Sequence, residues 1–252
     1  MITINNENIA EVESLVIEAK EHKNKPLPTV IFYHGFQSAK ENNLTLAYLL
    51  AKENYRVILP EARYHGERSE NLTDSEMSLA FWDIILANIA ELEKIKADLE
   101  KDNLILNYRI GVAGTSMGGI TTTAMLKEYS WIKTGVVLMG SPDLTKFSSQ
   151  LIENFNKTSE EKISEEEEAE VINQLLPFDL SKNIKALNNR PLMFWHGELD
   201  DIVPINQSES FVELLKKSSY SGEVKMLKEK NRGHHLSRYS ILETVRWFVK
   251  HL

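Results

Sequence analysis

The sequence predicts an α/β protein with a doubly wound, mostly parallel sheet of about eight strands, and two observations support this prediction. Several short runs rich in β-branched and aromatic residues are continuously apolar, as in strands that are buried on both faces. Helical stretches separate these runs, which is the order of a sheet covered by helices on both sides. With 252 residues, of which 42% are hydrophobic, the chain can form one sizeable core. We therefore expect a single domain over residues 1–252.

The expected elements follow one another along the chain. Two weaker strand candidates in the first 28 residues end near Pro26 and Pro28, which fits an antiparallel hairpin at a sheet edge. Buried strands are expected at 29–34, 55–60, 109–114, 134–140 and 191–197, and a last strand is expected at 223–229. Helices are expected at about 40–53, 76–101, 117–129, 206–219 and 238–251. Residues of about 143–190 show helical periodicity without a strand signal and predict a small helical insertion, or cap, over the sheet.

Charge and composition exclude several classes of partner. The formal net charge of −8 repels a nucleic-acid backbone or an anionic membrane surface at long range. The absence of cysteine excludes disulfides, thiolate metal sites and a cysteine nucleophile. No apolar run approaches the ~20 residues that span a bilayer, and the first residues lack a signal-peptide pattern. We therefore expect a cytoplasmic protein without a nucleic-acid or membrane partner, and leave assembly into a homo-oligomer open.

A serine lies between glycines at the point where a predicted strand becomes a predicted helix. The pattern is Gly114-x-Ser116-x-Gly118. A serine nucleophile at the end of a strand must present its hydroxyl on a tight turn, and the flanking positions of that turn are too crowded for side chains. Ser116 is therefore the candidate nucleophile, with Gly114 and Gly118 as the elbow glycines.

A serine hydroxyl needs a base to take its proton, and the base needs an acid that orients it. In proteins with such an elbow, the chain order is serine, then acid, then histidine. Asp200 and Asp201 follow the strand expected at 191–197, and His234 and His235 lie in the loop before the last helix. Position alone leaves both members of each pair open.

Six segments carry a family resemblance: FYHGFQSAKE (32–41), YRVILPEARYHGER (55–68), FWDIIL (81–86), VAGTSMGG (112–119), WHGELDDIVP (195–204) and RGHHLS (232–237). They resemble the α/β-hydrolase superfamily, and more narrowly the small bacterial carboxylesterases of the YitV/YjfP type, on the dienelactone-hydrolase and prolyl-oligopeptidase branch. The family pattern HGxxDxxVP implies Asp200 as the acid, with Asp201 as second choice. The family's GH pair implies His234 as the base, with His235 as second choice.

The remaining catalytic element is an oxyanion hole, which uses two backbone N–H groups. One belongs to the residue after the nucleophile, Met117. The resemblance implies that the other is the Phe36 N–H, with Gly35 allowing close approach of the backbone. The nearby His34 is expected to hydrogen-bond backbone groups of its own loop.

His65 precedes the serine in the chain, which breaks the usual order for a catalytic base. We therefore expect it to fix the loop beside the site through hydrogen bonds, with Arg68 paired to a nearby carboxylate.

A serine at the elbow makes esters, thioesters and peptides the candidate acyl donors. The resemblance implies a carboxylesterase that cleaves short-chain acyl esters through an acyl-enzyme on Ser116, with a small-molecule ester and water as its partners. This chemistry requires no metal and no organic cofactor. A thioesterase, or a small peptidase similar to acyl-peptide hydrolases, is the alternative. A non-catalytic binding module is disfavoured because the nucleophile, the acid, the base and the oxyanion loop are all present.

Overall fold

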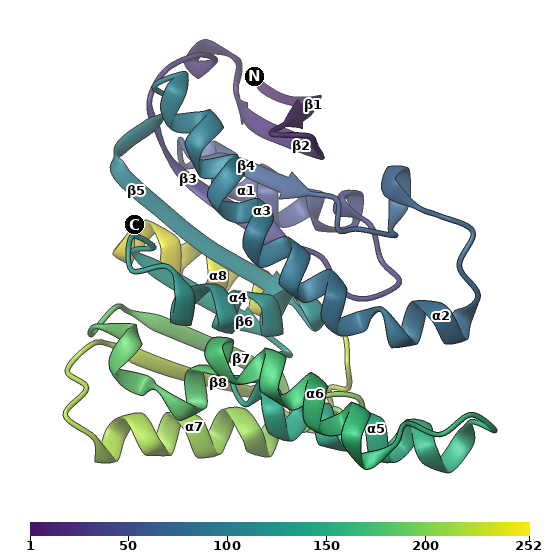
Figure 1. The fold of residues 1–252 in the computed structure, drawn as a ribbon. Coiled ribbons are helices and arrows are strands. Elements are labelled where there is room, and N and C mark those ends of the chain that lie inside the picture. The colour runs from purple at the N-terminus through teal and green to yellow at the C-terminus, as the bar shows by residue number, and fades with distance from the viewer.

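An eight-stranded sheet runs through the computed structural model, which describes all residues 1–252 (Figure 1). Its strands lie in the order β1-β2-β4-β3-β5-β6-β7-β8. They span β1 (Ile2–Ile9), β2 (Val12–Ala19), β3 (Leu27–Tyr33), β4 (Arg56–Pro60), β5 (Ile105–Thr115), β6 (Thr134–Leu138), β7 (Leu192–Gly197) and β8 (Val224–Glu229). Strands β3 to β8 pair in parallel, whereas β1 and β2 form an antiparallel hairpin at one edge. The predicted fold class is confirmed.

Helices cover both faces of the sheet. They are α1 (Leu44–Lys52), α2 (Asp74–Leu79), α3 (Phe81–Lys101), α4 (Met117–Glu128), α5 (Leu144–Thr158), α6 (Glu165–Leu175), α7 (Ile205–Lys217) and α8 (Arg238–His251). Short 3₁₀ helices add η1 (Lys20–His22), η2 (Lys40–Asn43), η3 (Gly66–Arg68), η4 (Leu176–Phe178), η5 (Leu180–Lys182) and η6 (Ile184–Leu187). None of the helices is both long and apolar enough to cross a lipid bilayer.

The apolar strands are buried on both faces because successive side chains point to opposite sides. In β3, Ile31 packs into a core shared with α3, α4 and α7, whereas Phe32 packs into a second core shared with α1 and α8. This division explains why the strand reads as a continuous apolar run and not as an alternating pattern.

Two elements differ from the sequence expectation. The helix expected over 76–101 is broken at Ala80 into α2 and α3, and α2 begins with a capping box between Thr73 and Glu76. Strand β5 begins at Ile105, four residues before the expected start. Asn107 and Tyr108 have positive φ angles and the pairing register with β3 shifts there, so this first part carries no buried-strand pattern.

The parallel strands all end at one edge of the sheet, which determines the position of the functional loops. Loops 34–40, 61–68, 198–204 and 230–237 follow β3, β4, β7 and β8, and Ser116 follows β5. Residues far apart in the sequence therefore meet at this edge.

Candidate active site

Ser116 lies on a strained turn between β5 and α4. Its backbone has φ 55° and ψ −117°, a conformation that is costly for a residue with a side chain. A Cβ atom at Gly118 would lie 2.0 Å from the Tyr33 carbonyl oxygen, and one at Gly114 would lie 2.2 Å from the Gly118 carbonyl oxygen. Only glycine fits at these two positions, so the turn requires both.

Ser116, His234 and Asp200 form a continuous chain of hydrogen-bonding contacts. His234 Nε2 lies 2.8 Å from Ser116 Oγ, and His234 Nδ1 lies 2.9 Å and 2.8 Å from the two carboxylate oxygens of Asp200. A proton on Nδ1 that is donated to Asp200 leaves the Nε2 lone pair free to accept the serine proton. The arrangement can therefore convert the serine hydroxyl into a nucleophile.

The Asp200 carboxylate is fully buried but well supplied with donors. Its Oδ1 accepts hydrogen bonds from the N–H groups of Ile202 and Val203, both at 3.0 Å, and its Oδ2 lies 3.2 Å from His196 Nε2. Burial opposes ionisation, but the contacts with His196, His234 and the Val203 N–H outweigh burial and hold the pKa of Asp200 well below its ordinary value. Asp200 is therefore a carboxylate over the working pH range of an enzyme.

The two second-choice residues point elsewhere. Asp201 is exposed, and no hydrogen bond joins its side chain to another residue. His235 is also exposed, and its Nε2 lies 2.8 Å from Arg232 Nη1. Neither side chain reaches Ser116, so the structure brings together Asp200 and His234 and leaves Asp201 and His235 at the surface.

The two expected oxyanion donors flank Ser116. Met117 is the first residue of α4, where a helical N–H has no partner within the helix. The Phe36 N–H makes no hydrogen bond within the protein. A Cβ atom at Gly35 would lie 3.4 Å from the Thr115 carbonyl oxygen and 3.5 Å from Ser116 Cβ, which are ordinary contacts. The loop therefore lies against the nucleophile, although less tightly at Gly35 than the sequence suggests.

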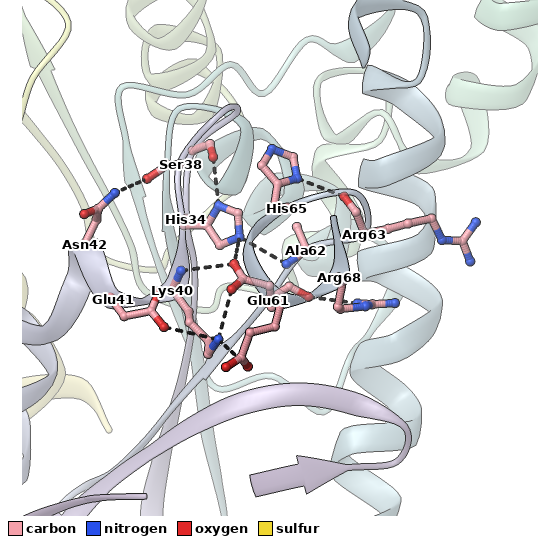
Figure 2. A network of polar contacts seen from close by, with 12 residues as sticks. His34, Ser38, Lys40, Glu41, Asn42, Glu61, Ala62, Arg63, His65 and Arg68 are labelled. Atoms are coloured by element: carbon pink, nitrogen blue, oxygen red, sulfur yellow. Dashed lines mark hydrogen bonds and ion pairs between the residues drawn. The ribbon is translucent and has the colours of Figure 1, made fainter. Parts of the chain in front are cut away.

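Below this loop lies a cluster of charged residues around a buried ion pair that the sequence reading missed (Figure 2). The Lys40 ammonium donates to Glu61 Oε2 at 3.0 Å and to Glu67 Oε2 at 2.9 Å, and lies 3.2 Å from Glu41 Oε1. The side chains of Lys40 and Glu61 are completely buried. Burial opposes ionisation of Glu61, but its contacts with His34 and Lys40 outweigh burial and lower its pKa to about 2. The cluster is therefore ionic at neutral pH.

His65 and Arg68 behave as expected from the sequence. The Gln37 N–H donates to His65 Nε2 at 2.9 Å, and His65 Nδ1 lies 2.8 Å from the Arg63 carbonyl oxygen. Burial lowers the pKa of His65, which favours the neutral ring that this pattern needs. The Arg68 guanidinium makes two hydrogen bonds to the Glu91 carboxylate, at 3.0 Å and 2.6 Å. The structural role of His65 and the pairing of Arg68 with a carboxylate are confirmed.

A cavity of about 460 Å³ opens beside Ser116, and 13 of its 16 lining residues are hydrophobic. The apolar lining comes from the oxyanion loop, from α2 and α3, from α4 to α6, and from the loop that carries Asp200. It consists of Phe36, Leu79, Phe81, Trp82, Ile120, Phe147, Leu151, Ile152, Phe155, Ile163, Val171, Ile202 and Val203. Besides Ser116, its polar residues are Ser78 and Glu167. No group of three or more histidine, aspartate or glutamate residues is arranged to hold a metal ion.

The chain is similar in sequence and in fold to known proteins. A model of the prolyl oligopeptidase family matches residues 43–252. The chain is 42% identical to YitV of Bacillus subtilis (strain 168), which carries the name of an esterase, and 29% identical to the esterase YjfP of Escherichia coli (strain K12). Both alignments cover 100% of each chain. The crystal structure of TT1662 from Thermus thermophilus is similar with a TM-score of 0.78 and 20% identity, over 99% of this chain and 97% of that one.

Proposed function

Because this chain belongs to the prolyl oligopeptidase family, we propose that it is a serine carboxylesterase whose catalytic residues are Ser116, His234 and Asp200. The observation that carries the proposal is the unbroken contact from Ser116 Oγ through the His234 ring to the Asp200 carboxylate, at the mouth of an apolar cavity. The relatives of full matching length, YitV and YjfP, are both named as esterases, which favours ester cleavage over peptide cleavage.

The proposed reaction has two halves. Ser116 Oγ attacks the ester carbonyl carbon while His234 Nε2 takes the hydroxyl proton, and the resulting oxyanion accepts hydrogen bonds from Phe36 N–H and Met117 N–H. His234 returns the proton to the departing alcohol as the carbon–oxygen bond breaks, which leaves an acyl group on Ser116. Water then repeats the attack with the same proton transfers and releases the acid. Asp200 stabilises the imidazolium in both halves.

The sequence resemblance implies short-chain acyl esters, and the size of the cavity leads us to include larger apolar acyl groups in the proposal. Its volume of about 460 Å³ lies in the range of about 300–1,000 Å³ that holds drug-sized ligands. We place the acyl group there, with residues of about 143–190 as a cap that supplies one wall through α5 and α6. A small-molecule ester and water are then the partners. A cytoplasmic location stays part of the proposal and rests on the sequence pattern alone.

A series of p-nitrophenyl esters from acetate to decanoate tests this proposal. Each methylene that enters an apolar cavity gains about 0.8 kcal/mol, which is about fourfold in kcat/KM. We expect such a rise from acetate upward until the cavity is full, and a loss of turnover by several orders of magnitude in Ser116→Ala. Highest activity on acetate, falling with every added carbon, would contradict the placement of the acyl chain.

A substitution that narrows the cavity provides a second test of where the acyl chain binds. Leu151 lines the cavity from α5, whereas Leu176 is exposed to solvent in η4. We expect Leu151→Trp to shift the optimum toward shorter acyl chains and to leave acetate turnover within about threefold. Leu176→Trp serves as the control and should leave the chain-length profile unchanged.

Thioesters and small peptides remain the alternative substrates, and the family description favours testing peptides. A comparison of p-nitrophenyl esters with acyl thioesters and aminoacyl anilides at matched concentration decides between them. Faster cleavage of the anilides would replace the esterase proposal by a peptidase.

A further inference from the structure

The loop that carries Phe36 is held on both sides of this residue by the segment that follows β4. On one side, His34 Nε2 lies 3.1 Å from the Ala62 nitrogen and 3.0 Å from Glu61 Oε1. On the other side, the Gln37 N–H donates to His65 Nε2 at 2.9 Å. The Phe36 N–H, which is the proposed second oxyanion donor, therefore lies between two fixed points.

Glu61 also anchors the far end of this loop. Its Oε1 accepts the Lys40 backbone N–H at 3.2 Å, and its Oε2 accepts the Lys40 ammonium at 3.0 Å. The backbone of η3 closes over the same carboxylate, because a Cβ atom at Gly66 would lie 1.9 Å from Glu61 Oε2. One buried carboxylate thus contacts residues 34 and 40, the two ends of the oxyanion loop (Figure 2).

Stability is a weak reason to keep such a cluster in a protein interior. Removing a lysine and a glutamate from water is costly, and apolar side chains of similar volume often stabilise a fold as well or better. An ion pair with good geometry does, however, hold its partners in one arrangement. An oxyanion hole needs that, because its donors must lie within about 2.7–3.1 Å of the position where charge develops.

We propose that Glu61 and His65 are positioning residues that hold the Phe36 N–H in place as an oxyanion donor. Glu61 acts through His34 and Lys40, and His65 acts through the Gln37 N–H. Neither residue contacts Ser116, so they do not take part in proton transfer. This inference rests on the proposed serine esterase activity.

Two single substitutions test the inference. Glu61→Gln removes the charge that binds Lys40, and His65→Phe removes the acceptor for the Gln37 N–H. Since a displacement of about 1 Å can cost a factor of about 100, we expect kcat to fall by about 10-fold to 100-fold, with KM within about threefold. The inhibition constant of an aryl trifluoromethyl ketone, whose adduct with Ser116 carries an oxyanion, should rise by the same factor.

Glu67→Gln is the matched control, because Glu67 also binds the Lys40 ammonium but makes no hydrogen bond or ion pair with any residue from 34 to 37. We expect this variant to keep wild-type kcat and wild-type affinity for the ketone. Circular dichroism melting of each variant establishes that it is folded. If Glu61→Gln does not fold, His65→Phe decides the question, since it leaves the ion pair of Lys40 and Glu61 in place.

The inference is overturned if a folded variant of Glu61 or His65 keeps wild-type kcat and wild-type affinity for the ketone. It is also overturned if Glu67→Gln loses as much kcat and affinity as these variants. An increase in KM alone would also overturn it. These outcomes differ from a failure of the proposed function, in which the wild-type protein itself turns over no ester or Ser116→Ala keeps full activity.

Discussion

The two sides of Ser116 are built differently. On the side of the base, Asp200 and His234 lie on two loops that are joined by a backbone hydrogen bond from Leu199 N–H to the Arg232 carbonyl oxygen. Several side chains around them are exposed, and His234 itself is 19% exposed. On the oxyanion side, the loop that carries Phe36 lies on the completely buried ion pair of Lys40 and Glu61.

This difference matches the tasks of the two sides. The imidazole takes and returns a proton in each half of the proposed reaction, and it must do so with substrates and water that enter from solvent. The oxyanion donors stabilise charge only when they are already in place, because reorganisation during the reaction would cost the free energy that they supply. A rigid, buried support is therefore most valuable on the oxyanion side.

The largest expected effect lies on the side of the base. Asp200→Asn keeps the shape of the side chain but cannot hold the correct tautomer of His234, so we expect kcat to fall by about 10⁴-fold. Its exposed neighbour provides the control, and Asp201→Asn should change kcat by less than about threefold. Steady-state kinetics on the preferred p-nitrophenyl ester measure both values. Equal effects of the two substitutions would remove the distinction between these aspartates.

Acid should lower the free energy of unfolding, because it protonates Glu61 below the oxyanion loop. Its pKa is lowered from an ordinary value of 4.5 to about 2, so the folded protein favours the ionised form. The resulting stabilisation is fully present above about pH 4.5 and is lost as the pH falls toward 2. The shift corresponds to about 3 kcal/mol at most.

Urea unfolding between pH 5 and pH 2.5 measures this loss. We expect the free energy of unfolding to fall less steeply with acid in Glu61→Gln than in the wild type, because the variant lacks the titrating group. Identical slopes would show that the carboxylate is not held in its ionised form by the cluster.

The smallest expected effect concerns the glycine beside the oxyanion donor. A methyl group at Gly35 meets only ordinary contacts, so we expect Gly35→Ala to fold normally and to keep kcat within about threefold. Gly118→Ala is the contrasting variant, because its Cβ would lie 2.0 Å from the Tyr33 carbonyl oxygen and requires the backbone to move. Thermal melting should show a large loss of stability for Gly118→Ala alone.

The sequence predicted the side of the base better than the oxyanion side, for a physical reason. The elbow glycines, the aspartates after a strand and the histidines before the last helix follow a fixed chain order, which limits the choice to two neighbouring residues for the acid and two for the base. The family resemblance then implies Asp200 and His234. The ion pair of Lys40 and Glu61 joins residues from two loops that only the parallel pairing of β3 and β4 brings together. Charged residues are usually at the surface, so composition offered no hint of their burial.

One signal for Glu61 was nevertheless present. It follows a buried strand directly, at the edge of the sheet where parallel strands place functional groups. The break of the expected long helix at Ala80 had no comparable signal, because alanine is a good helix former. The cavity depends on that region, since Leu79 and Phe81 on either side of the break both line it.

The most direct test of the proposed mechanism is mass spectrometry of the intact protein and its peptides after reaction with a fluorophosphonate. We predict a single adduct on the peptide that contains Ser116, its complete absence in Ser116→Ala, and labelling at least about 10³-fold slower in His234→Ala than in His235→Ala. A folded wild-type protein that remains unlabelled, or an adduct on a different residue, would contradict the assignment of Ser116 as the nucleophile.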